Sequence, residues 1–381
     1  MKKTLAYLWI GAFFLFMLFQ SCVNVESAGI MEKPPRLKHS GPFIPGELKA
    51  GWNLGNNLDS HNQGFTSNRP GDFETLWSNP LVTEDLIIQI MEAGFDIIRI
   101  PVTWYPHMDN NHQVNSSWMN RVQEVVNYCL DSGLYVIINS HHDSFYDPSE
   151  ENMEDAPLIM ETLWKQIGQR FSDYDDRLLF EGMNEPRLRD TPYEWSGGTE
   201  EARRNINLLN KTFVDTVRGL GGQNGRRYLL VTPYCARITE ESLLELELPM
   251  DDRLIVSVHL YQPYNFVQNT DGSPSWSSQN PNDTARIDEA MAILDMHLVR
   301  KGIPVMITEF GAVDKQNVAD RIAWVRYITE KASGLGISCI WWDNGGRNNP
   351  GSRGRGYSLI NRHTGEWLFP GLVKALTALP R

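Results

Sequence analysis

The feature that most constrains the fold of this chain is a regular alternation of short apolar segments with longer segments of helical periodicity. The apolar segments are rich in Ile and Val and are apolar throughout, as expected for parallel strands that are covered on both faces. They predict strands at 50–54, 97–102, 135–139, 178–182, 228–232, 254–258, 305–308 and 338–341. The helical patterns lie at 84–93, 118–131, 158–171, 202–220, 285–301 and 318–333. Eight strands with intervening helices favour a closed (β/α)8 barrel, the TIM barrel, over an open doubly wound sheet.

Two of these helices have recognisable ends. Thr83 can cap the first one, and Gly94 can end it, because a side-chain oxygen satisfies free backbone amides and glycine tolerates a left-handed turn. Ser117 is expected to cap the helix at 118–131. No Gly-rich phosphate-binding motif follows any strand, which argues against a nucleotide-binding fold.

The N-terminal residues have the character of a targeting segment. Lys2 and Lys3 precede an uninterrupted apolar run at 5–19, which is short for a membrane span of about 20 residues and predicts a signal peptide over 1–21. Cys22 follows a small residue, as in lipoprotein signals, so a lipid anchor through Cys22 is favoured over ordinary export. Residues 22–45 are expected to form a tether and 46–381 a single catalytic domain, on an outer-membrane surface or secreted.

Charge and cysteine content narrow the classes of partner. A net charge of −12 makes nucleic acid or an anionic membrane surface an unexpected partner. Beyond Cys22 only Cys129, Cys235 and Cys339 remain, and no Cys/His cluster has the spacing of a zinc site. We expect a monomer that needs neither a cofactor nor a metal.

Polar and aromatic residues follow nearly every predicted strand. In a (β/α)8 barrel the carboxyl ends of the strands share one mouth, where active sites lie, so residues far apart in the sequence should converge there. These residues are Asn56, Asn57, Arg99, Trp104, His141, His142, Asp143, Asn184, Glu185, His259, Tyr261, Glu309, Trp342, Asp343 and Asn344.

Two carboxylates in such a mouth suit glycoside hydrolysis. That reaction needs an acid to protonate the leaving oxygen and a carboxylate at the anomeric carbon. Glu185 follows the fourth strand and Glu309 the seventh, and these strands face each other across an eight-stranded ring. Sequence spacing alone leaves open whether the pair stands at the retaining separation of about 5 to 5.5 Å or at the longer inverting one.

Six ordered motifs resemble glycoside hydrolase family 5. They are 51–56 (GWNLGN), 98–104 (IRIPVTW), 137–142 (IINSHH), 180–187 (FEGMNEPR), 258–261 (VHLY) and 307–311 (ITEFG). They are most similar to the branch that contains endoglucanases, lichenases and xyloglucanases, subfamily 4. The resemblance implies a retaining endo-β-1,4-glucanase acting on β-glucan polysaccharides.

The resemblance also implies roles for the catalytic residues. Glu309 would be the nucleophile and Glu185 the acid/base, with a raised pKa in the free enzyme because a nearby carboxylate hinders its ionisation. Arg99 would keep Glu309 ionised and oriented, and Tyr261 would hydrogen-bond it. His259 would lie near Glu185.

Sugar contacts are implied for a further group of residues. Asn184 would bind the 2-hydroxyl of the sugar being cleaved, and Trp342 would be the platform beneath that sugar. His141 would line the pocket with His142 beside it. The remaining substrate-binding candidates are Asn56, at the end of the first strand, and Trp104 and His107, at neighbouring subsites.

Several polar residues are as well explained by a structural role as by a role in catalysis or binding. Glu181 points the same way as Glu185 but deeper, which suggests a structural role. Asp343 and Glu366 are expected at the surface or behind the site, and Arg187 suits a loop salt bridge as well as a substrate contact. Long loops at 62–79 and 264–282 are expected to shape the cleft.

Three alternatives remain open at the level of sequence. A metal-dependent barrel hydrolase could use His141, His142, Asp143 and His259 as zinc ligands. A non-catalytic glucan-binding protein could have the same barrel, although it would be expected to have lost one carboxylate. Within the enzymes, an endo-β-1,4-mannanase is the nearest alternative, and the preferred glucan is undecided.

Overall fold

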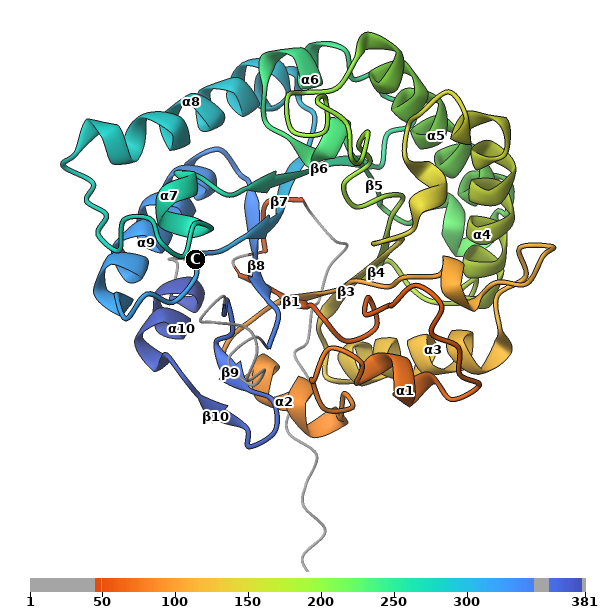
Figure 1. Ribbon diagram of the computed structural model, residues 1–381, viewed down its shortest axis with the longest axis horizontal. Coiled ribbons are helices and arrows are strands. Elements are labelled where there is room, and N and C mark those ends of the chain that lie inside the picture. Colours follow the sequence, from red (N-terminus) through yellow and green to blue (C-terminus); the bar gives the residue numbers. More distant parts are fainter. Residues whose placement is uncertain (1–44, 49, 346–355, 379–381) are drawn as a thin grey trace, which may run out of the picture. The chain divides into compact units, whose positions relative to one another are not determined.

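The computed structural model describes residues 45–48, 50–345 and 356–378, so the predicted signal peptide and nearly all of the tether lie outside the described residues. All eight predicted strands form, and they close in chain order into a parallel barrel in which the first strand pairs with the last (Figure 1). The strands are β1 (Gly51–Leu54), β2 (Ile97–Ile100), β3 (Tyr135–Asn139), β4 (Leu178–Glu181), β5 (Leu229–Val231), β6 (Leu254–Leu260), β7 (Val305–Phe310) and β8 (Ser338–Asp343). The predicted (β/α)8 fold is confirmed.

Helices surround this barrel, as the view down its axis shows (Figure 1). They are α1 (Pro70–Glu74), α2 (Glu84–Glu92), α3 (Ser116–Asp131), α4 (Ala156–Arg170), α5 (Glu200–Gly219), α6 (Glu240–Leu244), α7 (Tyr264–Val267), α8 (Pro281–His297), α9 (Val318–Gly334) and α10 (Pro370–Thr377). A two-stranded hairpin, β9 (Ile360–Asn361) with β10 (Glu366–Trp367), precedes α10. Short 3-10 helices follow β2 (η1, Tyr105–His107) and β5 (η5, Tyr234–Ala236).

The helix caps agree with the sequence in one case and differ in the other. Thr83 accepts a hydrogen bond from the Leu86 amide at 3.3 Å, as predicted for α2. The cap of α3 is Asn115, whose side chain accepts from the Ser117 amide at 2.8 Å, so the prediction of Ser117 as the cap is wrong. Asparagine and serine are equally good caps, and the helix begins at Ser116, two residues earlier than the apolar pattern indicates.

The barrel interior changes from apolar at one end to polar at the other. A buried apolar cluster fills the lower interior: Leu48, Ile97, Tyr135, Ile137, Leu179, Leu230, Ile255, Met306 and Ile340. Nearer the mouth the inward positions are occupied by buried polar side chains, among them Asn53, Arg99 and Glu181. Buried polar groups are stable only when they are hydrogen-bonded, so this layer must be an organised network.

β7 contains an irregularity next to its carboxyl end. Ile307 pairs with Val258 of β6, but the next pair is Glu309 with His259, so β7 has one residue more than β6 at this point. A bulge of this kind re-aims a side chain that regular alternation would turn to the other face. Both Thr308, whose hydroxyl lies 2.6 Å from that of Ser257, and Glu309 therefore face the barrel interior.

The seam between β8 and β1 is held by a buried arginine from the C-terminal hairpin. Arg362 donates to the Gly55 carbonyl at 2.7 Å, to the Asp343 carboxylate at 2.9 Å, and to the Asn57 side chain. Asp343 is fully buried and also accepts from the Leu359 amide at 2.7 Å. Of the two positions expected for Asp343 and Glu366, at the surface or behind the site, Asp343 takes the buried one and Glu366 the exposed one.

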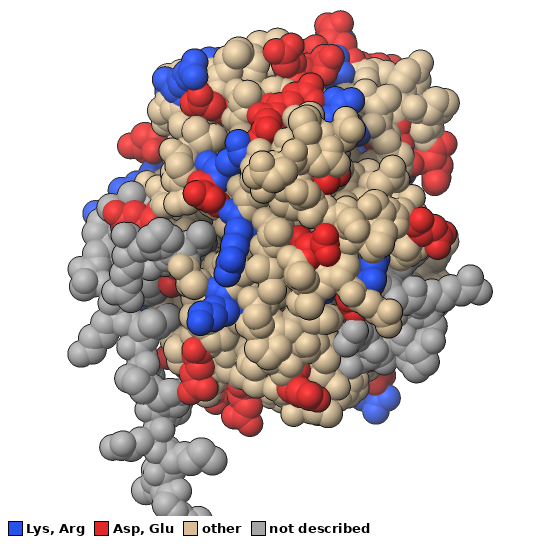
Figure 2. Space-filling model, turned by 90° about the vertical axis from the view of Figure 1, so that its left-hand side faces the viewer, with Lys and Arg blue, Asp and Glu red and all other residues tan. Residues whose placement is uncertain are grey.

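The outer surface seen from the α8 side carries charges of both signs. Figure 2 shows acidic side chains scattered over this face and basic ones gathered into a short stripe among them. This mixed face differs from the broad basic surface of a nucleic-acid-binding domain. Within the described residues, none of the helices has the length and apolar character needed to cross a bilayer.

Candidate active site

Arg99 is the hub of the polar layer below the mouth. It stands on β2, fully buried, and its Nε donates to Glu181 at 2.7 Å while Nη1 donates to Glu309 at 2.7 Å. Nη1 also donates to Asn53 at 2.9 Å, and Nη2 donates to Asn184 at 2.7 Å. Burial disfavours its charge, but Glu181 and Glu309 outweigh burial and raise the pKa of Arg99 further above its ordinary value. This one cation on β2 thus orients residues from three other strands, β1, β4 and β7.

Glu181 has the structural role that the sequence suggested. Besides Arg99, it accepts from the Asn139 amide at 2.8 Å and from the Ser257 hydroxyl at 2.5 Å. Its carboxylate is fully buried and all of these partners lie inside the barrel. Glu181 therefore pairs with Nε of Arg99 and leaves Nη1 free to pair with Glu309.

Glu309 is held by two donors on opposite oxygens. Arg99 bonds Oε1 at 2.7 Å, and the Tyr261 hydroxyl bonds Oε2 at 3.0 Å. Only about a twentieth of the residue is exposed, at 5%. An arginine and a phenol thus hold both carboxylate oxygens of Glu309, which fixes its orientation at the mouth.

Glu185 faces Glu309 across the mouth and is paired with His259. Its Oε1 lies 2.7 Å from His259 Nδ1, and its side chain is 21% exposed, which leaves it reachable from the cleft. His259 Nδ1 also lies 3.6 Å from Glu309 Oε2. An oxygen of Glu185 and an oxygen of Glu309 lie within 4.8 Å of each other. That separation is typical of retaining glycosidases and too short for the roughly 6.5 to 9.5 Å of inverting ones.

The direction of the pKa shift at Glu185 differs from the expectation. Burial raises the pKa of Glu185, but the hydrogen bond and charge of His259 and the charge of Arg187 outweigh burial, and the pKa is lowered. Burial lowers the pKa of His259, but Glu309 and Glu185 outweigh burial, and its pKa is raised. The two pKa values are thus shifted in opposite directions, and the expectation of a raised pKa for Glu185 is wrong.

The other wall of the mouth is aromatic. The rings of His141 and Trp342 are stacked, with centroids 5.7 Å apart and planes 3° from parallel. The side-chain NH2 group of Asn139 lies 3.1 Å from His141 Nδ1. The side-chain oxygen of Asn139 accepts a hydrogen bond from the backbone amide of Val102, which identifies the other side-chain atom as the nitrogen. Because that NH2 group can only donate, His141 Nδ1 is the acceptor and Nε2 carries the hydrogen. In this tautomer Nε2 of His141 can donate a hydrogen bond to a hydroxyl.

Two further predicted residues stand beside this wall. His142 is half-buried, with Nε2 3.6 Å from the buried Asp59 carboxylate and its ring 5.0 Å from that of His61. Asn56 adopts a left-handed backbone conformation, φ 63°, just after β1, and its carbonyl accepts from Asn79 at 2.9 Å. Neither side chain is fully buried, and a contact of either with substrate stays a prediction.

Trp104 and His107 do not reach the cleft. Trp104 is fully buried and donates to the Asn139 carbonyl at 2.7 Å. His107 stacks on Trp118 at 3.7 Å, and burial lowers its pKa to about 3. The prediction that Trp104 and His107 contact substrate is wrong, because η1 turns both side chains into the core behind β2 and β3.

Sequence reasoning missed the residues that support the catalytic groups. Asn53 and Ser257 were hidden within apolar strands, and a polar residue inside an otherwise apolar strand is the signal that could have found them. Arg187 was left undecided; its Nη1 lies 3.6 Å from Glu185 Oε2 and its Nε bonds Glu194 at 3.0 Å.

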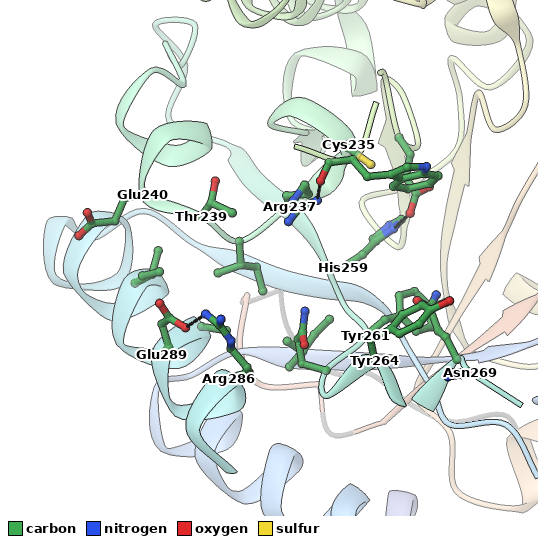
Figure 3. A pocket seen from close by; sticks show the side chains of 18 of the residues that line it. Cys235, Arg237, Thr239, Glu240, His259, Tyr261, Tyr264, Asn269, Arg286 and Glu289 are labelled. Carbon is green, nitrogen blue, oxygen red and sulfur yellow. Dashed lines mark hydrogen bonds and ion pairs between the residues drawn. The ribbon is translucent and has the colours of Figure 1, made fainter. Parts of the chain in front are cut away.

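A large cavity of about 1550 Å³ opens beside Glu185. It runs outward over β6, from His259 and Tyr261 at its inner end to the gap between α6 and α8 (Figure 3). In Figure 3 Glu240 lies on one side of this gap, and Arg286, paired with Glu289, lies on the other. The volume exceeds the roughly 300 to 1,000 Å³ usual for small-ligand pockets, as an extended ligand would require.

Comparisons with known proteins identify the family of this chain. Residues 58–348 match the family described as "Cellulase (glycosyl hydrolase family 5)". The chain is 41% identical to "Endoglucanase A" of Ruminococcus albus, over 87% of this chain and 91% of that protein.

Solved structures of endoglucanases are also similar to this chain. A GH5-4 broad specificity endoglucanase from Clostridium longisporum matches with a TM-score of 0.83 and 38% identity, covering 87% of this chain and 95% of that one. A xyloglucan-specific endo-beta-1,4-glucanase from a metagenomic library, in complex with cellotriose, matches with a TM-score of 0.81 and 37% identity, covering 87% and 97%.

Proposed function

The chain belongs to glycosyl hydrolase family 5, and on that premise we propose that it is a retaining endo-β-1,4-glucanase with Glu309 as nucleophile and Glu185 as acid/base. The observation that carries these roles is the short separation of the two carboxylates, within 4.8 Å, with different partners on each. Arg99 and Tyr261 donate to the two oxygens of Glu309 and hold it in place. Glu185 is the one that shares a proton with His259.

In the first displacement, Glu309 attacks the anomeric carbon while the bond from that carbon to the glycosidic oxygen breaks. The oxygen takes the proton of the Glu185–His259 pair through Glu185. As Glu309 bonds to the sugar its negative charge is lost, and with it the largest influence that raises the pKa of His259. Proton movement from His259 to Glu185 and on to the leaving oxygen is thereby favoured at the moment it is needed.

In the second displacement, Glu185 takes a proton from a water molecule, whose oxygen attacks the anomeric carbon and releases Glu309 as a carboxylate. The proton returns to the Glu185–His259 pair, so the enzyme is regenerated. Two inversions give net retention at the anomeric carbon. Arg99 and Tyr261 remain in place to receive the restored negative charge.

The substrate class follows from the relatives together with the shape of the mouth. Both the curated relative and the solved structures named above are endoglucanases, and one of them acts on xyloglucan. The cavity beside Glu185 is open at its outer end, which suits attack within a long chain. We assign β-1,4-glucan polysaccharides as the substrate class, and oligosaccharides of the same linkage as the smaller substrates.

The decisive experiment is hydrolysis of a soluble β-glucan by Glu309→Gln. We expect a loss of activity of at least about a thousandfold, because the nucleophile is removed while its volume is kept. Glu366→Gln, at an exposed position on β10, is the matched control and should retain wild-type activity. Unchanged hydrolysis by Glu309→Gln would rule out the assignment, and a wild-type preference for mannan over xyloglucan, lichenan and carboxymethylcellulose would identify a mannanase instead.

The proposed location is the cell surface, with Cys22 lipidated after removal of 1–21. This rests on the charged and apolar pattern of the N-terminal sequence. Metabolic labelling with a radioactive fatty acid should mark the wild-type protein and leave Cys22→Ala unlabelled and released from the membrane fraction. A Cys22→Ala protein that is distributed like the wild type would support plain export.

A further inference from the structure

Trp195 and Tyr264 are the two aromatic residues with more than half of their surface exposed on the wall of the cavity that also contains Glu185, and of the two Trp195 has the larger ring. It lies in the loop between β4 and α5, is 58% exposed, and lines the same cavity as Glu185 and His259. A large exposed aromatic ring is ordinary when it stands alone on a surface. Here it borders the space into which the cleaved chain must extend.

The indole is fixed from behind rather than left mobile. The Arg187 guanidinium lies over one face of the ring, 4.8 Å from its centroid, and is itself held by Glu194 at 3.0 Å. Arg187 also donates to the Glu185 carbonyl at 3.1 Å. Arg237 donates to the Trp195 carbonyl, which anchors the backbone. One face of the ring is therefore covered by a cation, and its exposure lies on the remaining side.

The position of this cavity tells which end of the substrate it takes. Its lining includes Glu185, the proton donor, but neither Trp342 nor His141, which form the stacked wall on the other side of the catalytic pair. In the proposed function the sugar attacked by Glu309 lies on Trp342. The chain beyond the bond that Glu185 protonates must then run into the cavity lined by Trp195.

We propose that Trp195 is a sugar-stacking platform for the leaving-group side of the glucan chain, and that it determines how strongly long chains bind. The ring and its Arg187 backing form a rigid flat surface, and a pyranose presents an apolar face of C–H groups to such a surface. This inference rests on the proposed function for the identity of the ligand. It assigns a specificity-determining residue outside the catalytic centre.

The test compares substrates that differ only in the leaving group. An aryl β-cellobioside ends at the cleaved bond with a small aromatic group, whereas cellohexaose extends several sugars into the cavity. For Trp195→Ala we expect KM for cellohexaose to rise about tenfold, which corresponds to 1.4 kcal/mol, with a much smaller change for the aryl substrate. Trp195→Phe should recover most of the loss, because it keeps a stacking face.

Tyr193→Ala is the matched control. Tyr193 lies two residues away in the same loop and is 52% exposed, but it does not line the cavity. Its removal should leave KM for both substrates at the wild-type value. End-labelled cellohexaose adds a second readout, because a weakened leaving-group platform should shift which bond is cut.

The outcomes separate this inference from the proposed function. If the wild type hydrolyses no β-glucan, the proposed function itself fails. If the wild type is active and Trp195→Ala has the wild-type KM for cellohexaose, the platform is wrong while the function stands. Equal losses on both substrates would also overturn the platform, since Trp195 would then act by holding Arg187 near Glu185.

Discussion

At the scale of single residues, three basic side chains contact the two catalytic carboxylates. Arg99 lies against Glu309, His259 against Glu185, and Arg187 is 3.6 Å from Glu185 on the cleft side. The first two are almost completely buried and fixed in the barrel, whereas Arg187 stands on a loop. Arg187 is therefore the charge that can be altered with least disturbance to the fold.

Replacing Arg187 should move the pH dependence of hydrolysis. A positive charge favours the ionised carboxylate, so its removal raises the pKa of the Glu185–His259 pair, and the pair then keeps its proton to a higher pH. For Arg187→Met we expect the basic limb of kcat/KM to shift upward by about 0.5 to 1 pH unit. A pH profile on the aryl β-cellobioside measures this.

Arg187→Lys provides the comparison for that experiment, because it keeps the positive charge while losing the guanidinium geometry. Its basic limb should stay closer to that of the wild type than the limb of Arg187→Met does. A downward shift in Arg187→Met would mean that Arg187 does not act on Glu185 through its charge.

At the scale of elements, the positions of the strands could be predicted from the sequence, but the bulge in β7 could not. Ile- and Val-rich segments placed all eight strands within a few residues, because strands buried on both faces have a distinctive composition. The bulge in β7 left no such signature. It depends on the register between β6 and β7, which is a property of two segments paired in space.

In the candidate site, too, some residues could be predicted from the sequence and others could not. Glu185, Glu309, Arg99 and Tyr261 were found because charged and polar residues at strand ends contrast with their apolar surroundings. Trp104 was misplaced because its identity suits a sugar platform and a core equally well, and only the turn of η1 decides between them. The direction of the pKa at Glu185 could not be predicted either, since it depends on the 2.7 Å contact with His259.

The C-terminal hairpin yields a prediction about stability. Arg362 joins β8 to the residues that follow β1, and its side chain is completely buried. Arg362→Met would leave the Asp343 carboxylate buried without its cation, which costs about 3 to 5 kcal/mol in the free energy of unfolding. Denaturant unfolding followed by tryptophan fluorescence measures it.

Arg204→Met is the control for that measurement. Arg204 pairs with Glu200 on the surface of α5, and its side chain is 64% exposed, so solvent screens the pair. Its loss should change the free energy of unfolding by less than about 0.5 kcal/mol. Equal effects of the two substitutions would show that the buried seam contributes no more than a surface contact.

At the scale of the whole molecule, closure of the barrel joins its first strand, β1, to its last strand, β8. β1 pairs with β8 over four residues, and β8 also supplies Trp342 at the mouth. A chain that stops at Gly336 would lack β8 and expose the edges of both β1 and β7. Exposed strand edges pair with other chains, so we expect this product to be insoluble, whereas the full chain expressed in parallel is soluble.

A soluble, monomeric truncation product with native circular dichroism would contradict that expectation. It would mean that seven strands can close or stay covered without β8. Size-exclusion chromatography distinguishes these results directly.

The open cavity beside Glu185 has a consequence for what the enzyme synthesises. After the first displacement the departing chain vacates this space while the remaining sugar is still esterified to Glu309. A second oligosaccharide that stacks on Trp195 would then place a hydroxyl, in place of water, before Glu185, and a new glycosidic bond would form. At high cello-oligosaccharide concentration, mass spectrometry of the early products should detect chains longer than the starting material, and their yield should fall in Trp195→Ala.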